Sequence, residues 1–356
     1  MKNKLIACYQ QFFFYAQQIY CKLRFWLLKK KYAKILKIKE DKLNNLKLKN
    51  EKHFIFITKN KNTWEYESIS WGLKRIGTLS VIFNDDYNTQ SLILKINSAI
   101  KPVKNNILVT FHGKKAGITK RLLDYANLKD IFTVLISLDD QLGFFGKLGW
   151  DLSFSKSASI VKHADLCLTS SSSSLVKYKS HCALAKLLKV GTNLEKFALK
   201  KKIDFKNDFV FVGQIYGVRK ILINLLEKNN IMVHKFGGST ENGRISDSKM
   251  IDLYHQSKAI LGFGFVGHTT KLKLVKGRDA EALATGSIYV TSFSSDLQKM
   301  FGHMPNLFMY HNSEELFHIL KKIQRFNNKR FKNIRDIVKR RRKSLGWDEV
   351  FREIFE

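Results

Sequence analysis

The residues best suited to chemistry lie in the second half of the chain, where an apolar run ends in glycine and a basic helix start follows. Phe209–Val212 (FVFV) is typical of a buried strand, Gly213 follows it directly, and Arg219 and Lys220 precede the helical pattern of residues 221–227. Glycine lets a ligand approach the backbone, free N–H groups at a helix start favour anions, and arginine binds two phosphate oxygens at once. The pattern therefore predicts an anion-binding turn.

A second group lies in KGRDAEALATGSIYVT, residues 276–291. Arg278 and Glu281 are three residues apart, so they share one face of a predicted helix near its N-terminus. An arginine there reinforces an anion-binding helix end, and the carboxylate one turn later can accept hydrogen bonds from two neighbouring hydroxyls, such as those of a ribose. The alternative interpretation is a surface Arg–Glu ion pair.

Two polar groups follow predicted strands in the first half. His112 comes after residues 107–111, and Asp139 comes after residues 131–137. Ligand crevices of open parallel sheets lie beyond the carboxyl ends of the strands, so both residues are candidate general bases or ligands of a hydroxyl-rich acceptor. The alternative is that they only terminate their strands. Residues 59–62 (KNKN) stand where a glycine-rich phosphate loop would follow the first strand, so we expect the main phosphate site elsewhere.

These groups require a scaffold of alternating strands and helices. Strands are predicted at residues 53–58, 79–83, 107–111, 131–137, 165–168, 209–212, 232–236, 259–265 and 288–290, and helices at 66–77, 91–100, 119–128, 221–227, 248–256, 276–286 and 314–324. Such alternation is typical of parallel βαβ units in a doubly wound sheet. We therefore expect an α/β protein of two Rossmann-like domains, 51–197 and 198–330, between an amphipathic helical extension (1–50) and a basic C-terminal helix (331–356).

The chain carries 63 lysines and arginines against 30 acidic residues, a net charge of +33. Compositional drift explains this charge, because lysine is spread over the whole chain; the alternative is an anionic partner such as a nucleotide diphosphate, a membrane surface or nucleic acid. No basic motif is interleaved with aromatic residues, so no nucleic-acid partner is expected, and the KRRRK run at 339–343 is interpreted as a solvated helix face. The four cysteines, Cys8, Cys21, Cys167 and Cys182, lack metal-ligand spacing and are predicted to be buried reduced thiols of a cytoplasmic protein.

The N-terminal extension combines apolar periodicity with basic charge. Residues 1–50 hold thirteen lysines and arginines and only two acidic residues, Glu40 and Asp41. Apolar residues recur at spacings of four and three: Leu5, Tyr9, Phe12, Ala16, Ile19, Leu23 and Trp26. Glutamines and basic residues interrupt the run, which argues against a transmembrane span, and no small-residue site for signal cleavage follows. We expect an interfacial helix on an anionic leaflet, the inner face of the plasma membrane; the alternative is a helix packed on the body of the protein or on a partner.

The order and spacing of the second-half motifs resemble the CgeB-like (spore-maturation-type) branch of the GT-B glycosyltransferases, within the broad group 1 grouping. Residues 211–213 with Tyr216 and Arg219 resemble the family's strand–Gly–Tyr–Arg turn. Residues 233–237 (VHKFG) resemble the strand and glycine one helix later, and 278–286 (RDAEALATG) resembles its Arg-x-x-Glu donor-site helix. The resemblance is good over 205–292, looser over 53–197 and absent over 1–50.

The resemblance implies transfer of a sugar from a nucleotide-sugar donor to a cell-surface glycan, lipid or protein, without a further cofactor or a metal motif. It places the donor site in the second domain, with Arg219 near the diphosphate, Glu281 near the ribose and Arg278 nearby; the last helix would pack back on the first domain. The donor-site candidates are Gly213, Tyr216, Arg219, Lys220, Gly237, His268, Lys273, Arg278 and Glu281.

One position departs from the family pattern. Retaining relatives often carry a second glutamate eight residues before the one that matches Glu281, and this chain has Lys273 there. Lys271 or Lys273 would then face the phosphates and His268 would contact the sugar, and a retaining outcome is not implied. A catalytically inactive GT-B scaffold is the alternative function.

Overall fold

The computed structural model describes residues 2–61, 63–84, 88–102, 104–111, 118–138, 157–200 and 204–356. The chain divides into two compact units: unit 1 is Met1–Gln11 with Val190–Gly346, and unit 2 is Phe12–Lys189 with Trp347–Glu356. The candidate residues His112 and Asp139 lie outside the described residues.

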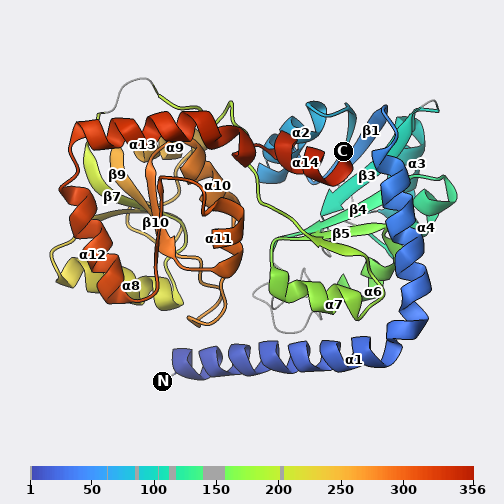
Figure 1. Ribbon diagram of the computed structural model, residues 1–356, viewed down its shortest axis with the longest axis horizontal. Helices are drawn as coiled ribbons and strands as arrows, with labels where there is room; N and C mark the ends of the chain where they lie inside the picture. The colour runs from blue at the N-terminus through green and yellow to red at the C-terminus, as the bar shows by residue number, and fades with distance from the viewer. Residues whose placement is uncertain are drawn as a thin grey trace. The chain divides into compact units, whose positions relative to one another are not determined.

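Unit 2 is built on a six-stranded sheet in the order β2-β1-β3-β4-β5-β6, with every neighbouring pair parallel (Figure 1). Its strands are β1 (Lys52–Thr58), β2 (Thr78–Phe83), β3 (Asn105–Phe111), β4 (Phe132–Ser137), β5 (Leu166–Thr169) and β6 (Ala185–Leu187). Its helices are α2 (Trp64–Lys74), α3 (Thr89–Ala99), α4 (Lys120–Leu128), α6 (Ser157–Ile160), α7 (Leu175–Lys179) and α14 (Trp347–Phe355), with 3₁₀ turns at Val161–His163 and Ser172–Ser174. Every residue of β1 is buried, as expected for a parallel strand covered on both faces.

Unit 1 holds a five-stranded parallel sheet in the order β11-β10-β9-β7-β8 (Figure 1). Its strands are β7 (Asn207–Val212), β8 (Val233–Phe236), β9 (Ser257–Gly262), β10 (Ile288–Ser292) and β11 (Leu307–Tyr310). Its helices are α8 (Gly217–Lys228), α9 (Asp247–His255), α10 (Gly277–Ala284), α11 (Ser295–Phe301), α12 (Ser313–Gln324) and α13 (Asn328–Arg341), followed by a 3₁₀ turn at Arg342–Leu345. Two parallel sheets flanked by helices confirm the prediction of two doubly wound, Rossmann-like domains.

The C-terminal region is divided between the units. α13 belongs to unit 1, whereas α14 belongs to unit 2, where it packs on α2. A Cβ atom on Gly72 would lie 2.5 Å from the Cβ of Trp347, so glycine is needed for this close approach. Trp347 is fully buried and stacks on Phe351, with ring centroids 5.3 Å apart. The last nine helical residues therefore complete the core of unit 2.

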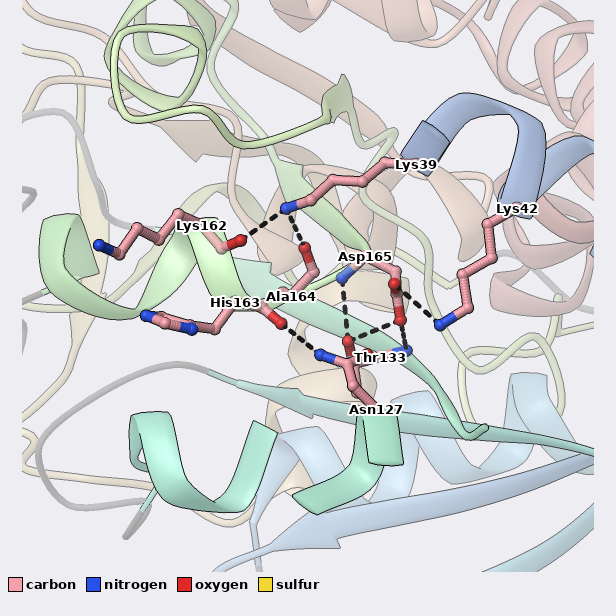
Figure 2. A network of polar contacts seen from close by, with 8 residues as sticks. All are labelled: Lys39, Lys42, Asn127, Thr133, Lys162, His163, Ala164 and Asp165. Atoms are coloured by element: carbon pink, nitrogen blue, oxygen red, sulfur yellow. Dashed lines mark hydrogen bonds and ion pairs between the residues drawn. The ribbon is translucent and has the colours of Figure 1, made fainter. Parts of the chain in front are cut away.

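The predicted N-terminal helix is confirmed as α1 (Lys2–Lys47), and a partly buried polar network holds its C-terminal part against the rest of unit 2 (Figure 2). Lys39 Nζ donates to the carbonyls of Lys162 (2.7 Å) and Ala164 (2.6 Å). Lys42 Nζ lies 3.0 Å from Asp165 Oδ1, and Asp165 Oδ2 accepts hydrogen bonds from the N–H and hydroxyl of Thr133 (2.8 and 2.9 Å). Burial lowers the pKa of Lys39, but its carbonyl acceptors satisfy the ammonium.

Cys21, Cys167 and Cys182 are buried, as predicted, but the prediction is wrong for Cys8, which is exposed on α1. Burial raises the pKa of the thiols of Cys21 and Cys182, which keeps them protonated. Among the described residues, no helix has a stretch long and apolar enough to cross a bilayer.

Candidate functional site

The candidate site lies where the strand order of unit 1 reverses. β7 pairs with β8 on one side and with β9 on the other, and in such sheets ligands bind beyond the carboxyl ends of the two strands at this switch point. Arg219, in the first turn of α8, connects the segment that follows β7 with the segment that follows β9. Its Nη1 donates to the carbonyl of Gln214 (3.2 Å), after β7, and its Nη2 donates to the carbonyl of Phe265 (2.9 Å), after β9. A guanidinium is thus fixed at the switch point.

Gly213 makes room for a second guanidinium beside Arg219, and Gly237 lets the turn after β8 approach Gly213 closely. Gly213 follows β7 with φ +152°, and a Cβ there would lie 2.6 Å from Nη1 of Arg278. Gly237 follows β8 with φ +146°, and a Cβ there would lie 2.1 Å from the carbonyl oxygen of Gly213. Both positions require the absence of a side chain, because any Cβ would displace the neighbouring turn or the arginine.

Arg219 is 5% exposed, and its guanidinium carbon lies 4.6 Å from the ring centroid of Tyr216. Burial lowers the pKa of Arg219; the phenol of Tyr216 opposes this shift and the charge of Arg278 adds to it. Nε of Arg219 and Nε of Arg278 make no hydrogen bond with any described residue. Two neighbouring guanidinium cations, each with an Nε–H that makes no hydrogen bond to a described residue, favour an anionic ligand.

The start of α10 supports Arg278 with buried acidic and phenolic groups. Asp279 Oδ2 accepts from the backbone N–H of Lys276 (2.7 Å), and Asp279 Oδ1 accepts from the hydroxyl of Tyr289 on β10. Burial raises the pKa of Asp279 and of Tyr289. Burial alone would lower the pKa of Arg278, but nearby phenols and the carboxylates of Glu281 and Asp279 raise it above the usual value. Glu281 is 5% exposed, so the alternative of a surface Arg–Glu pair is wrong.

His268 lies at the tip of a loop that returns on itself after β9. Backbone hydrogen bonds join Val266 N to Leu272 O and Leu274 N to Gly264 O, each at 2.9 Å. The ring of His268 lies 6.1 Å from that of Tyr216, between centroids, so the two candidates from separate loops are close together.

The first turns of α1 contact this loop within unit 1. Gln10 Oε1 accepts from the N–H of His268 (3.0 Å), and Gln11 Nε2 donates to Thr269 Oγ1. A Cβ on Gly267, whose φ is +67°, would lie 2.3 Å from Gln10 Oε1. Gln10 and Gln11 were not predicted as site residues, because polar residues within an apolar helix give no local signal of the loop they contact.

The structure places the two candidate lysines differently from the arginines. Lys273 Nζ donates to the carbonyl of Phe293 (2.7 Å) and lies 5.6 Å from the ring centroid of Phe265. Burial, followed by the charge of Lys271, lowers the pKa of Lys273. Lys220 is exposed on α8 beside Arg219. Gly213, Tyr216, Arg219, Gly237, His268, Arg278 and Glu281 are therefore gathered at the switch point, while Lys273 is directed at the loop after β10.

The site also contains residues that were not predicted from the sequence: Asp279, Tyr289 and Tyr254. Tyr254, at the end of α9, is fully buried, and its phenol contributes to the raised pKa of Arg278. Asp279 had a local signal, since an acidic residue three positions into a helix can cap it. The tyrosines had none, because they reach Asp279 and Arg278 only in the folded domain.

Comparisons with known proteins identify the fold. No protein-family model matches the sequence, and no functionally curated protein matches it. Among solved structures, Anabaena HepE in complex with UDP and glucose is similar with a TM-score of 0.54 at 12% identity, over 85% of this chain and 98% of that one. A glycosyltransferase from Rickettsia africae ESF-5 gives a TM-score of 0.53 at 11% identity, over 86% and 97%. Sucrose-phosphate synthase from Thermosynechococcus elongatus gives 0.52 at 11%, over 84% and 96%.

The alignments extend over nearly the whole of each solved chain and most of this one. They therefore cover both Rossmann-like units rather than a single βαβ motif, which many unrelated folds share. At these identities the similarity is one of fold. The chain has the two-domain GT-B fold of these glycosyltransferase structures.

Proposed function

We propose that this protein is a cytoplasmic glycosyltransferase of the CgeB-like branch, which binds a nucleoside-diphosphate sugar at the switch point of unit 1. The observation that carries the proposal is the pair of guanidiniums of Arg219 and Arg278, one bridging the segments after β7 and β9 and the other seated against Gly213. Planar guanidiniums bind phosphate oxygens in pairs, and their fixed positions at a switch point suit a diphosphate. The likeness in fold to HepE, which was solved with UDP and glucose, supports a nucleotide-sugar ligand.

The proposed mechanism uses these residues to stabilise the leaving group. Negative charge builds on the nucleoside diphosphate as the glycosidic bond to it breaks, and the preorganised cations Arg219 and Arg278 stabilise that charge. Glu281 accepts hydrogen bonds from the ribose hydroxyls, and His268 contacts the sugar. His112 and Asp139 are the candidate general bases for the acceptor, a cell-surface glycan, lipid or protein.

Calorimetry with UDP-, GDP-, ADP- and CMP-sugars tests the donor site. We expect one nucleotide class to bind the wild-type protein, and Arg219→Lys and Glu281→Gln each to weaken that binding at least about tenfold. A lost hydrogen bond to a charged group is worth about 1.5–3 kcal/mol, which corresponds to that factor or more.

Two exposed residues of unit 1 give matched controls, because Arg325→Lys and Glu314→Gln make the same chemical changes away from the switch point. Both controls should bind the donor like the wild type. Thermal unfolding of all four variants shows whether the fold is retained. Failure of the wild type to bind any nucleotide sugar, or equal binding by site and control variants, would refute the assignment.

A nucleotide-binding scaffold without transferase activity is the second candidate, and Lys273 favours it. This residue replaces the glutamate of retaining relatives, and its ammonium is bound to the carbonyl of Phe293. Donor hydrolysis and transfer assays distinguish the two functions, because a scaffold binds the nucleotide sugar but neither hydrolyses nor transfers it over a panel of glycan, lipid-linked and protein acceptors.

A further inference from the structure

The N-terminal helix leaves large apolar side chains in solvent. Six residues of α1 form what we call the apolar face, and their exposed fractions run from 50% for Tyr20 to 74% for Trp26: Phe12, Ile19, Tyr20, Leu23, Trp26 and Leu27. They recur every three or four residues, so they share one side of the helix. An exposed apolar surface of this size marks an interaction site in a soluble protein.

The opposite side of the helix is the one that packs on unit 2. Phe14, Gln17 and Cys21 are buried there at the same helical spacing. Gln18 Nε2 donates to the carbonyl of Ser173 (2.6 Å), and Arg24 Nε donates to the carbonyl of Ser180 (2.9 Å). The helix is thus docked through the side that carries Phe14, Gln17 and Cys21, and its apolar face is not the surface that holds it to unit 2.

The polar network of Lys39, Lys42 and Asp165 fixes the helix a second time, near its C-terminal end (Figure 2). The contacts of Gln18 and Arg24, together with those of Lys39 and Lys42, oppose rotation of the helix. Turning the apolar face inward would break the hydrogen bonds of Arg24 and Lys39 and would leave the buried carbonyls that accept them without donors.

The charge next to the apolar face identifies its partner. Exposed lysines stand beside and directly after it, at Lys22, Lys29, Lys30 and Lys31, and residues 1–39 contain no acidic residue. A second copy of the helix would place lysines against lysines, which disfavours self-association. A leaflet of anionic phospholipid satisfies both features, because aromatic and aliphatic side chains enter the headgroup boundary while lysines contact the headgroups.

We propose that α1 docks this protein on an anionic membrane surface through the apolar face, with Lys22, Lys29, Lys30 and Lys31 at the level of the lipid phosphates. The helix lies along the surface, held to unit 2 by its other side. This inference goes beyond the proposed function and does not depend on it.

Flotation of the full-length protein with vesicles tests the proposal. Wild-type protein should bind vesicles that contain both phosphatidylcholine and phosphatidylglycerol. It should bind vesicles of phosphatidylcholine alone much more weakly. The double variant Leu23→Gln with Trp26→Gln should lower the partition coefficient at least about tenfold, because two inserted side chains are lost. Glutamine favours helix, and both residues are exposed, so folding should not change.

Unit 2 also provides a matched control for apolar exposure. Leu94 of α3 and Leu128 of α4 are 61% and 85% exposed and are not part of the apolar face, so Leu94→Gln with Leu128→Gln removes similar solvent-exposed apolar groups. This variant should float with the vesicles like the wild type. Equal loss of binding in both double variants, or no loss in either, would overturn the proposal.

The lysines are tested separately, with a control variant that loses the same three positive charges. Replacing Lys29, Lys30 and Lys31 with glutamine should lower the affinity for anionic vesicles about fivefold per lysine. The control replaces the exposed Lys329, Lys332 and Lys339 of α13 and should leave that affinity unchanged. Failure of the wild-type protein to float would refute membrane docking, and a dimer in sedimentation that the Leu23/Trp26 variant abolishes would assign the face to a second copy instead.

Discussion

Arg219 and Arg278 owe their positions to main-chain atoms and glycines. Two backbone carbonyls, those of Gln214 and Phe265, hold the guanidinium of Arg219, and Gly213 leaves the space that the guanidinium of Arg278 occupies. This arrangement leaves the Nε donors of both side chains without hydrogen bonds to any described residue. Residues placed in this way are preorganised for a ligand, because little rotamer freedom remains to be lost on binding.

A substitution of Gly237 tests whether its close approach to Gly213 constrains the site. We expect Gly237→Ala to destabilise unit 1 by about 2–4 kcal/mol, from the positive φ and from the clash of Cβ with the carbonyl of Gly213. Gly243→Ala is the matched control: its φ of +63° gives backbone strain, but no atom lies within 4 Å of the added Cβ. It should cost only about 1–2 kcal/mol.

Denaturation followed by far-UV circular dichroism, with hydrogen exchange of peptides from 204–346, measures both glycine variants. Hydrogen exchange is needed because residues 190–346 contain no tryptophan, so fluorescence does not report on that region. Equal destabilisation by the two substitutions would show that the approach of Gly237 to Gly213 does not constrain the site.

At the scale of elements, α14 shows how a short C-terminal helix completes a domain. Its buried aromatic residues stack in sequence, with centroid distances of 5.3 Å from Trp347 to Phe351 and 6.2 Å from Phe351 to Phe355. Phe355 also contacts Phe54 of β1 at 5.4 Å, so the helix is joined to the first strand of its own unit. Its position depends on these contacts rather than on helix propensity, since a nine-residue helix is marginal alone.

Phe351→Ala should therefore lower the stability of unit 2 by about 3–5 kcal/mol, the range for removing a large buried aromatic side chain. Glu353→Ala, on the exposed side of the same helix, should change it by no more than about 0.5 kcal/mol. Tryptophan fluorescence during urea denaturation measures both variants, because Trp347 stacks directly on the altered ring. A small effect of Phe351→Ala would mean that α14 is not part of the folded core.

For the whole molecule, the net charge of +33 makes acid a source of instability. Several histidines have lowered pKa values through burial, and His255 in α9 is the largest case, at about 4. Burial is the main cause for His255, and the charges of Lys200 and Arg335 add to it. The native state therefore keeps this imidazole neutral at a pH where the unfolded chain binds a proton.

The pH dependence of unfolding follows from this difference. Between pH 6.5 and about 4 the unfolded state binds more protons at His255 than the folded state does. Protonation of His255 therefore does not lower the free energy of unfolding above pH 6.5, and it lowers that free energy progressively as the pH falls toward 4. The loss is at most about 3 kcal/mol.

His255→Gln should flatten the pH profile of unit 1 over that interval, measured by circular dichroism and by hydrogen exchange of 204–346. Met232→Gln, at an exposed position without an ionisable group, should leave the profile unchanged and serves as the control. A wild-type stability that does not fall between pH 6.5 and 4 would contradict the argument.

The sequence by itself determined the alternation of elements and the fold class. Apolar runs such as those of β1 and β7, with glycine at the ends of β7 and β8, are local patterns, and they predicted two doubly wound domains that the structure confirms. The short strands β6 and β11 and the helix α11 were not predicted, because three to seven residues carry too little periodicity.

Only the tertiary structure decided which of these elements meet. The strand order brought the carbonyl of Phe265 to Arg219, and the packing of β10 against α10 gave Asp279 its partner Tyr289. Periodicity also predicted the apolar stripe of α1 but not that Gln17 and Cys21, on the other side, would be buried. The physical reason is the same in each case: local patterns report the environment a residue prefers, whereas its partner depends on contacts between segments far apart in the chain.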